Sequence, residues 1–235
     1  MANYKDLEAR LTSALKLDRA PVAVTFCESE PKGVRKFMGQ VPSGCSFWKL
    51  AASSPAFYTV PSDHYNCPIG SYTHNIALPK EREHELGDVL GFMSQIGYVK
   101  MEEVPQIPRW AKAPAAVVYA RLGEAPLPPD VVIVAGNARA AMLLGEASGS
   151  AGKSSGMTLP RPTCMAIPAA FAKGTTLSLA CIGNRVYTEV SDNEIYAFVR
   201  GADLEAIVGA LGKIIEANQQ LTSYHQERKP KLLQV

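Results

Sequence analysis

An internal repeat is the feature of this sequence that most limits the folds open to it. Two segments, GCSFWKLAASSPAFYTVPSDHYNCPIG and RPTCMAIPAAFAKGTTLSLACIGNR, carry the same order of parts. Each has a cysteine, a short alanine-containing helical stretch, a break, a β-rich run and a second cysteine, and the preceding runs PVAVTF and PDVVIV also correspond. We therefore expect two related halves, each with one thiol at a helix start and another at a strand end. If the halves pair about a twofold axis, four thiols converge.

Hydrophobic periodicity predicts helices and strands along the whole chain. The expected helices cover residues 4–17, 45–52, 82–97, 137–147, 164–172, 192–199 and 203–217, and the expected strands cover 22–26, 56–60, 115–120, 130–135 and 175–183. Asn137 is placed to cap the helix that it opens. Residues 101–115 are rich in proline and predict a connector, and residues 148–162 predict a loop.

These elements predict one α/β (α+β) domain over residues 1–235. Two related α/β halves, at 18–100 and 115–200, would pack around a shared central site, with mixed sheets and flanking helices. A C-terminal helical segment at 202–228 would follow them. A chain of 235 residues with 47% hydrophobic residues can bury a core of that size.

Charge and hydropathy exclude two classes of partner. The formal net charge is +2 and the basic residues are scattered, so we expect no nucleic-acid surface. No stretch approaches the roughly 18 apolar residues of a membrane span, and the N-terminus is charged throughout. The expected location is the cytoplasm. In that reducing compartment, metal ligation, catalysis or burial explains five cysteines better than disulfides do.

The four cysteines of the repeat are Cys45, Cys67, Cys164 and Cys181, and four thiolates are the ligand set of an iron–sulfur cluster or a structural zinc. Zinc ribbons pair cysteines a few residues apart, and this chain has no such pair. A Cys-Pro pair closes one ferredoxin ligand run, although it also occurs at haem thiolates. Structural cysteines and a nucleophilic thiol stay open as alternatives. Cys27 stands outside the repeat and is expected to be a small buried hydrophobe.

Several motifs together carry a resemblance to a known family. They are LKLDRAPVAVTF, CSFW, NCPIG, RPTC, LACIGNR and DNEIYAFV. The chain resembles the DUF169 family, the uncharacterised ArCR group of bacterial and archaeal proteins. The resemblance implies that the four cysteines of the repeat lie in family motifs and that Cys27 does not, and it implies no activity. The family pattern has glycine where this chain has Pro160 and Ala180.

Polar residues near the cysteines supply further candidates. His64 and His74 flank Cys67 and are candidates for a general acid, a ligand or a haem ligand, or are ordinary loop histidines. Asp63 and Arg185 are the other catalytic candidates. Asn66, Arg161 and Trp48 are candidates for contact with the cofactor, the tryptophan as apolar cover. The two arginines would bind an anionic substrate, offset the charge of a cluster, or pair with Asp63 or Glu189.

One rival motif is a phosphate-binding loop. Residues 147–154, ASGSAGKS, satisfy its permissive form. A working loop of this kind follows a strand and opens a helix, whereas here a helix precedes it. We therefore interpret the segment as a mobile loop covering the site next to Cys164. No serine-hydrolase elbow is present.

The leading hypothesis is an iron–sulfur protein, with a [4Fe-4S] cluster between the halves, acting as a redox, lyase or desulfurising enzyme on a small molecule. Four cysteine ligands would close the cluster for electron transfer to a partner, and three would leave one iron open to substrate. The alternative is a haem- or metal-binding sensor or carrier without turnover. Association of the chain into a homo-oligomer is left open.

Overall fold

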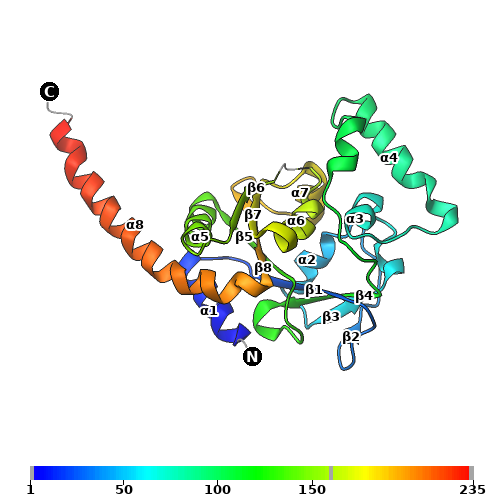
Figure 1. The fold of residues 1–235 in the computed structure, drawn as a ribbon, viewed down its shortest axis with the longest axis horizontal. Helices are drawn as coiled ribbons and strands as arrows, with labels where there is room; N and C mark the ends of the chain where they lie inside the picture. Colours follow the sequence, from blue (N-terminus) through cyan, green and yellow to red (C-terminus); the bar gives the residue numbers. More distant parts are fainter. Residues whose placement is uncertain (1–2, 159–160, 233–235) are drawn as a thin grey trace.

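A single mixed β-sheet runs through the molecule (Figure 1). The computed structural model describes residues 3–158 and 161–232. Within them the strands are β1 Val22–Cys27, β2 Arg35–Lys36, β3 Phe57–Thr59, β4 Ala116–Arg121, β5 Val131–Asn137, β6 Ser154–Met157, β7 Thr175–Ser178 and β8 Glu194–Arg200. Their order in the sheet is β2-β3-β4-β1-β5-β8-β7-β6. The expected α/β class is confirmed, and the two halves share this one sheet.

The sheet has the same construction when read from either edge. Its outer pairs, β2 with β3 and β6 with β7, are parallel, and its other neighbours are antiparallel. In the central β1–β5 pair, Ala23 lies opposite Val132, and the flanking pairs exchange position around this point. A local twofold axis therefore passes through the Ala23–Val132 pair. The axis groups β4 with the first half, although the sequence analysis placed residues 115–120 at the start of the second.

The helices repeat the same symmetry. They are α1 Tyr4–Leu15, α2 Ser46–Ala51, α3 Pro68–Thr73, α4 His84–Gln95, α5 Ala138–Ser150, α6 Ala166–Lys173, α7 Ile182–Thr188 and α8 Leu204–Leu232. Helix α2 joins β2 to β3 as α6 joins β6 to β7, and α3 follows β3 as α7 follows β7. Asn137 caps α5 as expected, because its side chain accepts a hydrogen bond from the Ala140 amide at 2.9 Å.

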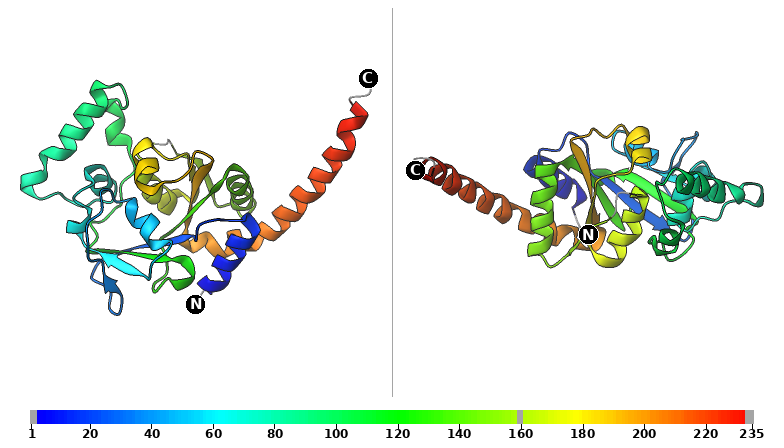
Figure 2. Two further views of the ribbon diagram at one scale, coloured as in Figure 1. Left: turned by 180° about the vertical axis from the view of Figure 1, so that it is seen from behind. Right: turned by 90° about the horizontal axis from the view of Figure 1, so that it is seen from above.

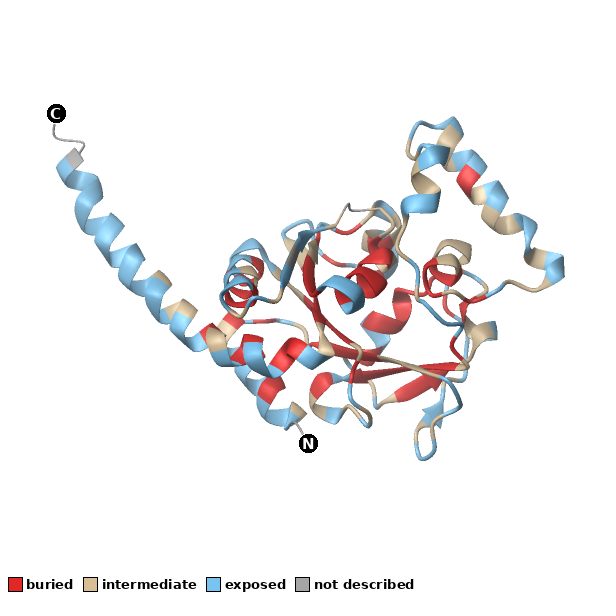
Figure 3. Ribbon diagram, viewed as in Figure 1, coloured by how far each residue is buried: buried red, intermediate tan, exposed pale blue. Residues whose placement is uncertain are grey.

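Helices cover both faces of the sheet, so the central strands are buried on both sides (Figure 3). Helices α2 and α6 pack on one face, and α1, α5 and the first turns of α8 on the other. Tyr196 and Phe198 of β8 point to the first layer, and Ala197 and Val199 to the second. Each large side chain buried in this way contributes about 1.5–3 kcal/mol to folding.

Two segments project from this body in all views (Figures 1 and 2). The C-terminal part of α8 extends away from the sheet, and residues 219–231 are exposed. The other segment is an arm that contains α4 and the turn Met101–Gln106, inserted between α3 and β4. In the part of the chain that the structure describes, no helix is long and apolar enough to cross a membrane.

Three predicted elements differ in the structure. Residues 192–199, predicted as a helix, contain most of β8, because the alternating pattern EIYAFVR pairs between β5 and β7. The predicted loop 148–162 contains the end of α5 and β6, and residues 159–160, including Pro160, lie outside the described part. Strand β7 ends at Ser178, and Ala180 then adopts a left-handed backbone with φ 65°. Cys181 therefore opens a helix instead of ending a strand.

Candidate metal centre

Each cysteine of the repeat lies where a helix begins. Cys45, Cys67 and Cys181 immediately precede α2, α3 and α7, and Cys164 lies in the turn Thr163–Met165 before α6. The prediction of a helix start is thus correct for Cys45 and Cys164. The predicted strand ends are wrong for Cys67 and Cys181, since seven residues separate Cys67 from β3 and two separate Cys181 from β7. Equivalent helices of the two halves therefore carry equivalent thiols.

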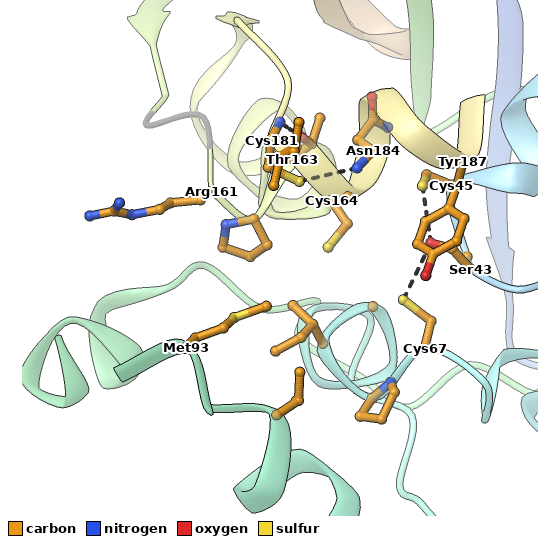
Figure 4. Close-up of a pocket in the computed structure, with 18 of the residues that line it drawn as sticks. Ser43, Cys45, Cys67, Met93, Arg161, Thr163, Cys164, Cys181, Asn184 and Tyr187 are labelled. Carbon is orange, nitrogen blue, oxygen red and sulfur yellow. Dashed lines mark hydrogen bonds between the residues drawn. The ribbon is translucent and has the colours of Figure 1, made fainter. Parts of the chain in front are cut away.

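The four thiols line one end of a single cavity of about 340 Å³. In Figure 4, the Cys67 side chain points into the cavity from the α3 side, and the other three cysteines point into it from the opposite side. Ser43 links the two thiols of the first half, because its Oγ lies 3.0 Å from Cys45 Sγ and 3.6 Å from Cys67 Sγ. The structure therefore brings together the four residues that the repeat singled out.

The thiols of the second half are held by backbone contacts. The Asn184 amide, in the first turn of α7, donates to Cys181 Sγ at 3.5 Å, and the Cys181 amide donates to Thr163 Oγ1 at 2.6 Å. The second of these bonds ties the start of α7 to the turn that carries Cys164. Both thiols of this half thus depend on one small hydrogen-bonded unit.

The glycine of the NCPIG motif leaves room for a thiol. A Cβ added at Gly70 would lie 2.9 Å from Cys67 Sγ, closer than van der Waals contact allows. Gly183, near the start of α7, has no atom within 4 Å of the same position. Cys67 can therefore fold its sulfur over the first turn of α3 only because residue 70 lacks a side chain.

Burial keeps two of the thiols protonated. It raises the pKa of Cys45 to about 12, against the opposing effect of the Ser43 hydrogen bond, and neighbouring Cys67 and Cys181 raise it further. Burial also raises the pKa of Cys164, and Cys67 adds to the shift. Such thiols are poor nucleophiles near pH 7, and a bound cation that displaces their protons would favour the thiolate form.

Buried donors without partners surround the thiols. Within the described residues, the Tyr119 hydroxyl and the side-chain nitrogen of Asn184 are buried without a hydrogen-bond partner, although the Asn184 amide oxygen accepts from Thr188 Oγ1 at 3.4 Å. The pKa of Tyr119 is raised by burial and then by Cys45, Cys67 and Cys164, so the hydroxyl lies near three of the sulfurs. Buried donors normally have a partner, and a ligand in the cavity would supply one.

The two histidines of the first half are buried and neutral. His74 lines the cavity, and both of its ring nitrogens lack a partner among the described residues. His64 does not line it, and its Nε2 is hydrogen-bonded to Thr59 Oγ1 at 2.8 Å. Burial lowers the pKa of His64 to about 3 and that of His74 to about 4. Neither ring is in the imidazolium form near pH 7, so neither is ready to act as a general acid, whereas neutral His74 retains a nitrogen lone pair.

Three other predicted residues lie away from the cavity. Asp63 accepts a hydrogen bond from the Val60 amide at 2.8 Å and thereby caps its own turn. Arg185 donates to the carbonyl oxygens of Leu179 and Ser191, and its ionic partner is Asp192, not Asp63 or Glu189. Trp48 packs under the site against the aromatic rings of β8. These side chains support the site and do not line it.

Asn66 and Arg161, in contrast, do line the cavity. The Asn66 side chain donates to the Val41 carbonyl at 3.1 Å and accepts from Arg82 at 3.3 Å. Arg161 lies 3.8 Å from Glu103, and its guanidinium points away from the four thiols in Figure 4. Of the alternatives for Arg161, pairing with Asp63 or Glu189 is wrong, because its ionic partner is Glu103.

Two further predictions concern segments outside the cavity. Cys27 lies half-buried in β1 with Val34, Val60 and Leu127, away from the other cysteines. Residues 147–154 run from the end of α5 into β6, the reverse of the strand-to-helix order of a phosphate-binding loop. They do not line the cavity, so the predicted cover over Cys164 is wrong.

The sequence analysis missed the residues that shape the rest of the cavity. Among them are Ser43, Gly70, Tyr98, Tyr187, Asn184 and, on α4, Val89, Leu90 and Met93. The helical spacing of the α4 residues was visible in the sequence, but the same spacing is found on any helix face that packs on a core. Ser43 offered no signal beyond its position two residues before a motif cysteine.

Fold and site together define a mixed α/β protein with four thiols around one cavity between its halves. Residues 10–210 match the model of DUF169, a family described as uncharacterised ArCR, and the chain belongs to this family. Searches of the curated proteins and of the solved structures found no match.

Proposed function

We propose that this protein binds an iron–sulfur cluster, [4Fe-4S] in the simplest case, through Cys45, Cys67, Cys164 and Cys181. The observation that carries the proposal is that equivalent helix starts of two symmetric half-sheets each contribute a thiol to one cavity. Cys₄ ligation is the common arrangement for such clusters. The reducing cytoplasm, which preserves free thiols, is the location that we propose.

The spread of the thiols favours a cluster over a single zinc ion. A structural zinc needs four ligands converging on one point about 2.3 Å from each sulfur. In residues 3–158 and 161–232, no three His, Cys, Asp or Glu side chains converge in that way. In a cluster each thiolate binds a different iron, so the ligands stand around a volume. Four thiols that line a cavity are compatible with such an arrangement, and this supports the proposal.

The unpartnered donors support the same conclusion. The Tyr119 hydroxyl and the Asn184 amide are buried beside the thiols, where thiolate and sulfide sulfurs would accept their hydrogen bonds. Such bonds tune the reduction potential of a cluster. These hydrogen bonds would remove the cost of burying the two donors without partners. They would also influence the reduction potential of the cluster.

We further propose that the protein is an enzyme acting on a small molecule. When bound, the cluster would supply one-electron transfer or, with three cysteine ligands, an open iron acting as a Lewis acid. The support is that the cavity continues past the thiols into an apolar chamber, which a purely structural cluster does not need. His74 and Asn66 are uncharged polar residues of the first half that line the cavity and could orient a substrate.

Anaerobic purification tests the cluster directly. We expect a brown protein with broad absorption near about 400 nm, and iron and acid-labile sulfide in equal amounts. Serine at each of the four positions should remove the chromophore, whereas Cys27→Ser, as the control, should keep it. A colourless, iron-free protein after anaerobic reconstitution would sink the proposal.

A haem- or metal-binding sensor or carrier is the second candidate. Two observations favour it: Cys67 is followed by Pro68, as at some haem thiolates, and His74 presents an unpartnered nitrogen to the same cavity. A sharp, intense Soret band in the purified protein would identify this alternative. It would then be tested with His74→Ala, which should shift the band by removing a ligand.

A further inference from the structure

We propose that the outer part of the cavity binds a small carboxylate with an apolar body, the carboxylate on Arg161 and the other end toward the thiols. This outer part, here called the vestibule, is lined by Val89, Leu90, Met93, Tyr98, Val99 and Ile107 together with Arg161. The idea that the other end of the ligand reacts at the thiols rests on the proposed function. The binding of the ligand in the vestibule does not depend on that function.

The wall of the vestibule selects an apolar body. Helix α4 turns Val89, Leu90 and Met93 toward the cavity, and its other face is exposed in the projecting arm (Figures 3 and 4). Leu90 is the buried residue of this helix. A ligand that covers these side chains removes apolar surface from water, and this burial favours binding. A sugar or a free amino acid would forgo most of that gain.

A single positive charge selects the head group. Arg161 is the one permanently charged side chain among the described residues that line the cavity, and His74, also in its lining, is neutral. One guanidinium matches a monoanion, and its planar fork fits the two oxygens of a carboxylate. A phosphate dianion would leave uncompensated charge in an apolar chamber.

The guanidinium is held in place without being neutralised. Its carbon lies 4.9 Å from the centre of the Tyr98 ring, a cation–π contact that fixes its orientation. Its ionic partner Glu103 lies 3.8 Å away, and both side chains are 38% exposed, so the pair is weak. An incoming carboxylate can therefore displace Glu103 or share the guanidinium with it.

The position of Arg161 fixes the direction of the ligand. Figure 4 draws its guanidinium on the Met93 side of the cavity, pointing away from the four sulfurs. A carboxylate bound there leaves the apolar chain directed along α4 toward Cys67 and Cys164. The arginine thus acts on a substrate and does not offset the charge of a cluster.

Calorimetric titration of the full-length protein with octanoate and with octanamide tests the proposal. Octanoate should bind at least about tenfold more tightly than the neutral amide, because a charge-assisted pair contributes that much. Arg161→Met should abolish the difference, and Glu103→Gln should tighten octanoate binding. Equal binding of the two probes to the wild type, or unchanged octanoate affinity in Arg161→Met, would overturn the proposal.

A second pair of variants guards against a folding defect. Met93→Glu places a negative charge in the vestibule and should weaken octanoate binding at least about tenfold while sparing octanamide more. Phe92→Glu is the matched control, since Phe92 is 59% exposed on the same helix and does not line the cavity. Equal losses in both variants would refute the assignment of the vestibule.

Iron and sulfide content, measured on the same samples, separate this inference from the proposed function. Octanoate binding that depends on Arg161, in protein that stays iron-free after anaerobic reconstitution, would support the vestibule and refute the cluster. A brown protein that binds neither octanoate nor octanamide would support the cluster and refute the vestibule.

Discussion

The two halves of the sheet are built alike where they hold thiols and differ everywhere else. Strands β1–β4 and β5–β8 correspond in order, direction and register, and α2 and α3 correspond to α6 and α7. The first half adds residues 74–115 between α3 and β4, where residues 189–193 suffice in the second. The second half adds α5, which covers the back of the sheet.

This difference separates a shared role from individual ones. The common framework presents two thiols per half, and the insertion of the first half builds the vestibule wall. Both buried histidines also belong to the first half, and residues 131–200 contain none. The first half therefore carries the apolar wall and the histidine of the cavity, the second half contributes Arg161, and both halves contribute equally to the proposed metal ligands.

The largest expected effect tests that equality. Cys45 and Cys164 occupy equivalent positions in the two halves, as do Cys67 and Cys181, and each is changed to serine in turn. If the four thiols are equivalent ligands, each variant should lose nearly all of its iron, and partners across the axis should lose the same amount. Iron and sulfide analysis after anaerobic purification measures this. A variant that keeps its iron would break the symmetry and identify the open position of a three-cysteine site.

A smaller effect is expected from the glycines that follow the thiols. Gly70→Ala should lower iron content severalfold, because the new Cβ would push the Cys67 sulfur out of its place. Gly183→Ala, a glycine in the first turn of α7, is the control and should leave the content unchanged, since that position is open. Helix propensity favours alanine by about 0.5–1 kcal/mol at both sites, so neither protein should unfold. Equal iron contents would contradict the contact at Gly70.

The histidines make stability depend on pH through the first half. His64 and His74 titrate at about 3 and about 4 when folded, against an ordinary value of 6.5. The free energy of unfolding has its full value, with respect to these two histidines, above pH 6.5. It falls as the pH drops from 6.5 toward 4, because the histidines take up protons in the unfolded chain and not in the folded one. Each buried histidine adds a slope of about 1.4 kcal/mol per pH unit in that range.

Urea denaturation of iron-free protein between pH 7.5 and 5 measures that slope. His74→Phe should reduce it by about half and keep the edge-on contact with Phe26, whose ring centre is 5.2 Å away. His84→Phe, on an exposed helix, is the control and should leave the slope unchanged. An unaltered slope in His74→Phe would mean that His74 does not titrate as its burial requires.

The smallest effect concerns a polar difference between equivalent strands at the site. Tyr119 of β4 and Phe198 of β8 occupy the same register positions, opposite Val24 and Ile133. Tyr119→Phe makes the halves alike and removes a donor near three sulfurs. We expect full iron content and a reduction potential lower by tens of mV, roughly, in redox titration. Phe198→Tyr should not mimic the loss, and an unchanged potential in Tyr119→Phe would place its hydroxyl outside the site.

Much of the framework was accessible from the sequence because it depends on local periodicity. The helices at 4–17 and 203–217 and the strands at 22–26 and 130–135 all appear, and the cap at Asn137 is present. Strand β8 was missed because its structure depends on pairing with β5, more than fifty residues earlier in the chain. Local propensity carries no information about such a partner.

The sequence predicted the cysteines of the site but not the polar residues around them. The repeat identified the thiols, since it fixes both residue type and position in the fold. For Asp63 and Arg185, nearness in sequence to a cysteine said nothing about side-chain direction, and both bind backbone groups instead. The vestibule depends on an inserted arm folding over the site, which no motif announces.

The central β1–β5 pair has a consequence for how the protein is made. Only the first half exists while the ribosome is still synthesising β5, and it then exposes the bare edge of β1 together with two thiols. The remaining thiols arrive after α6 and α7 have emerged. Iron delivered earlier would meet only half of its proposed ligands. We therefore expect the cluster to be inserted after the chain is complete, by a chaperone or donor protein that recognises the complete sheet.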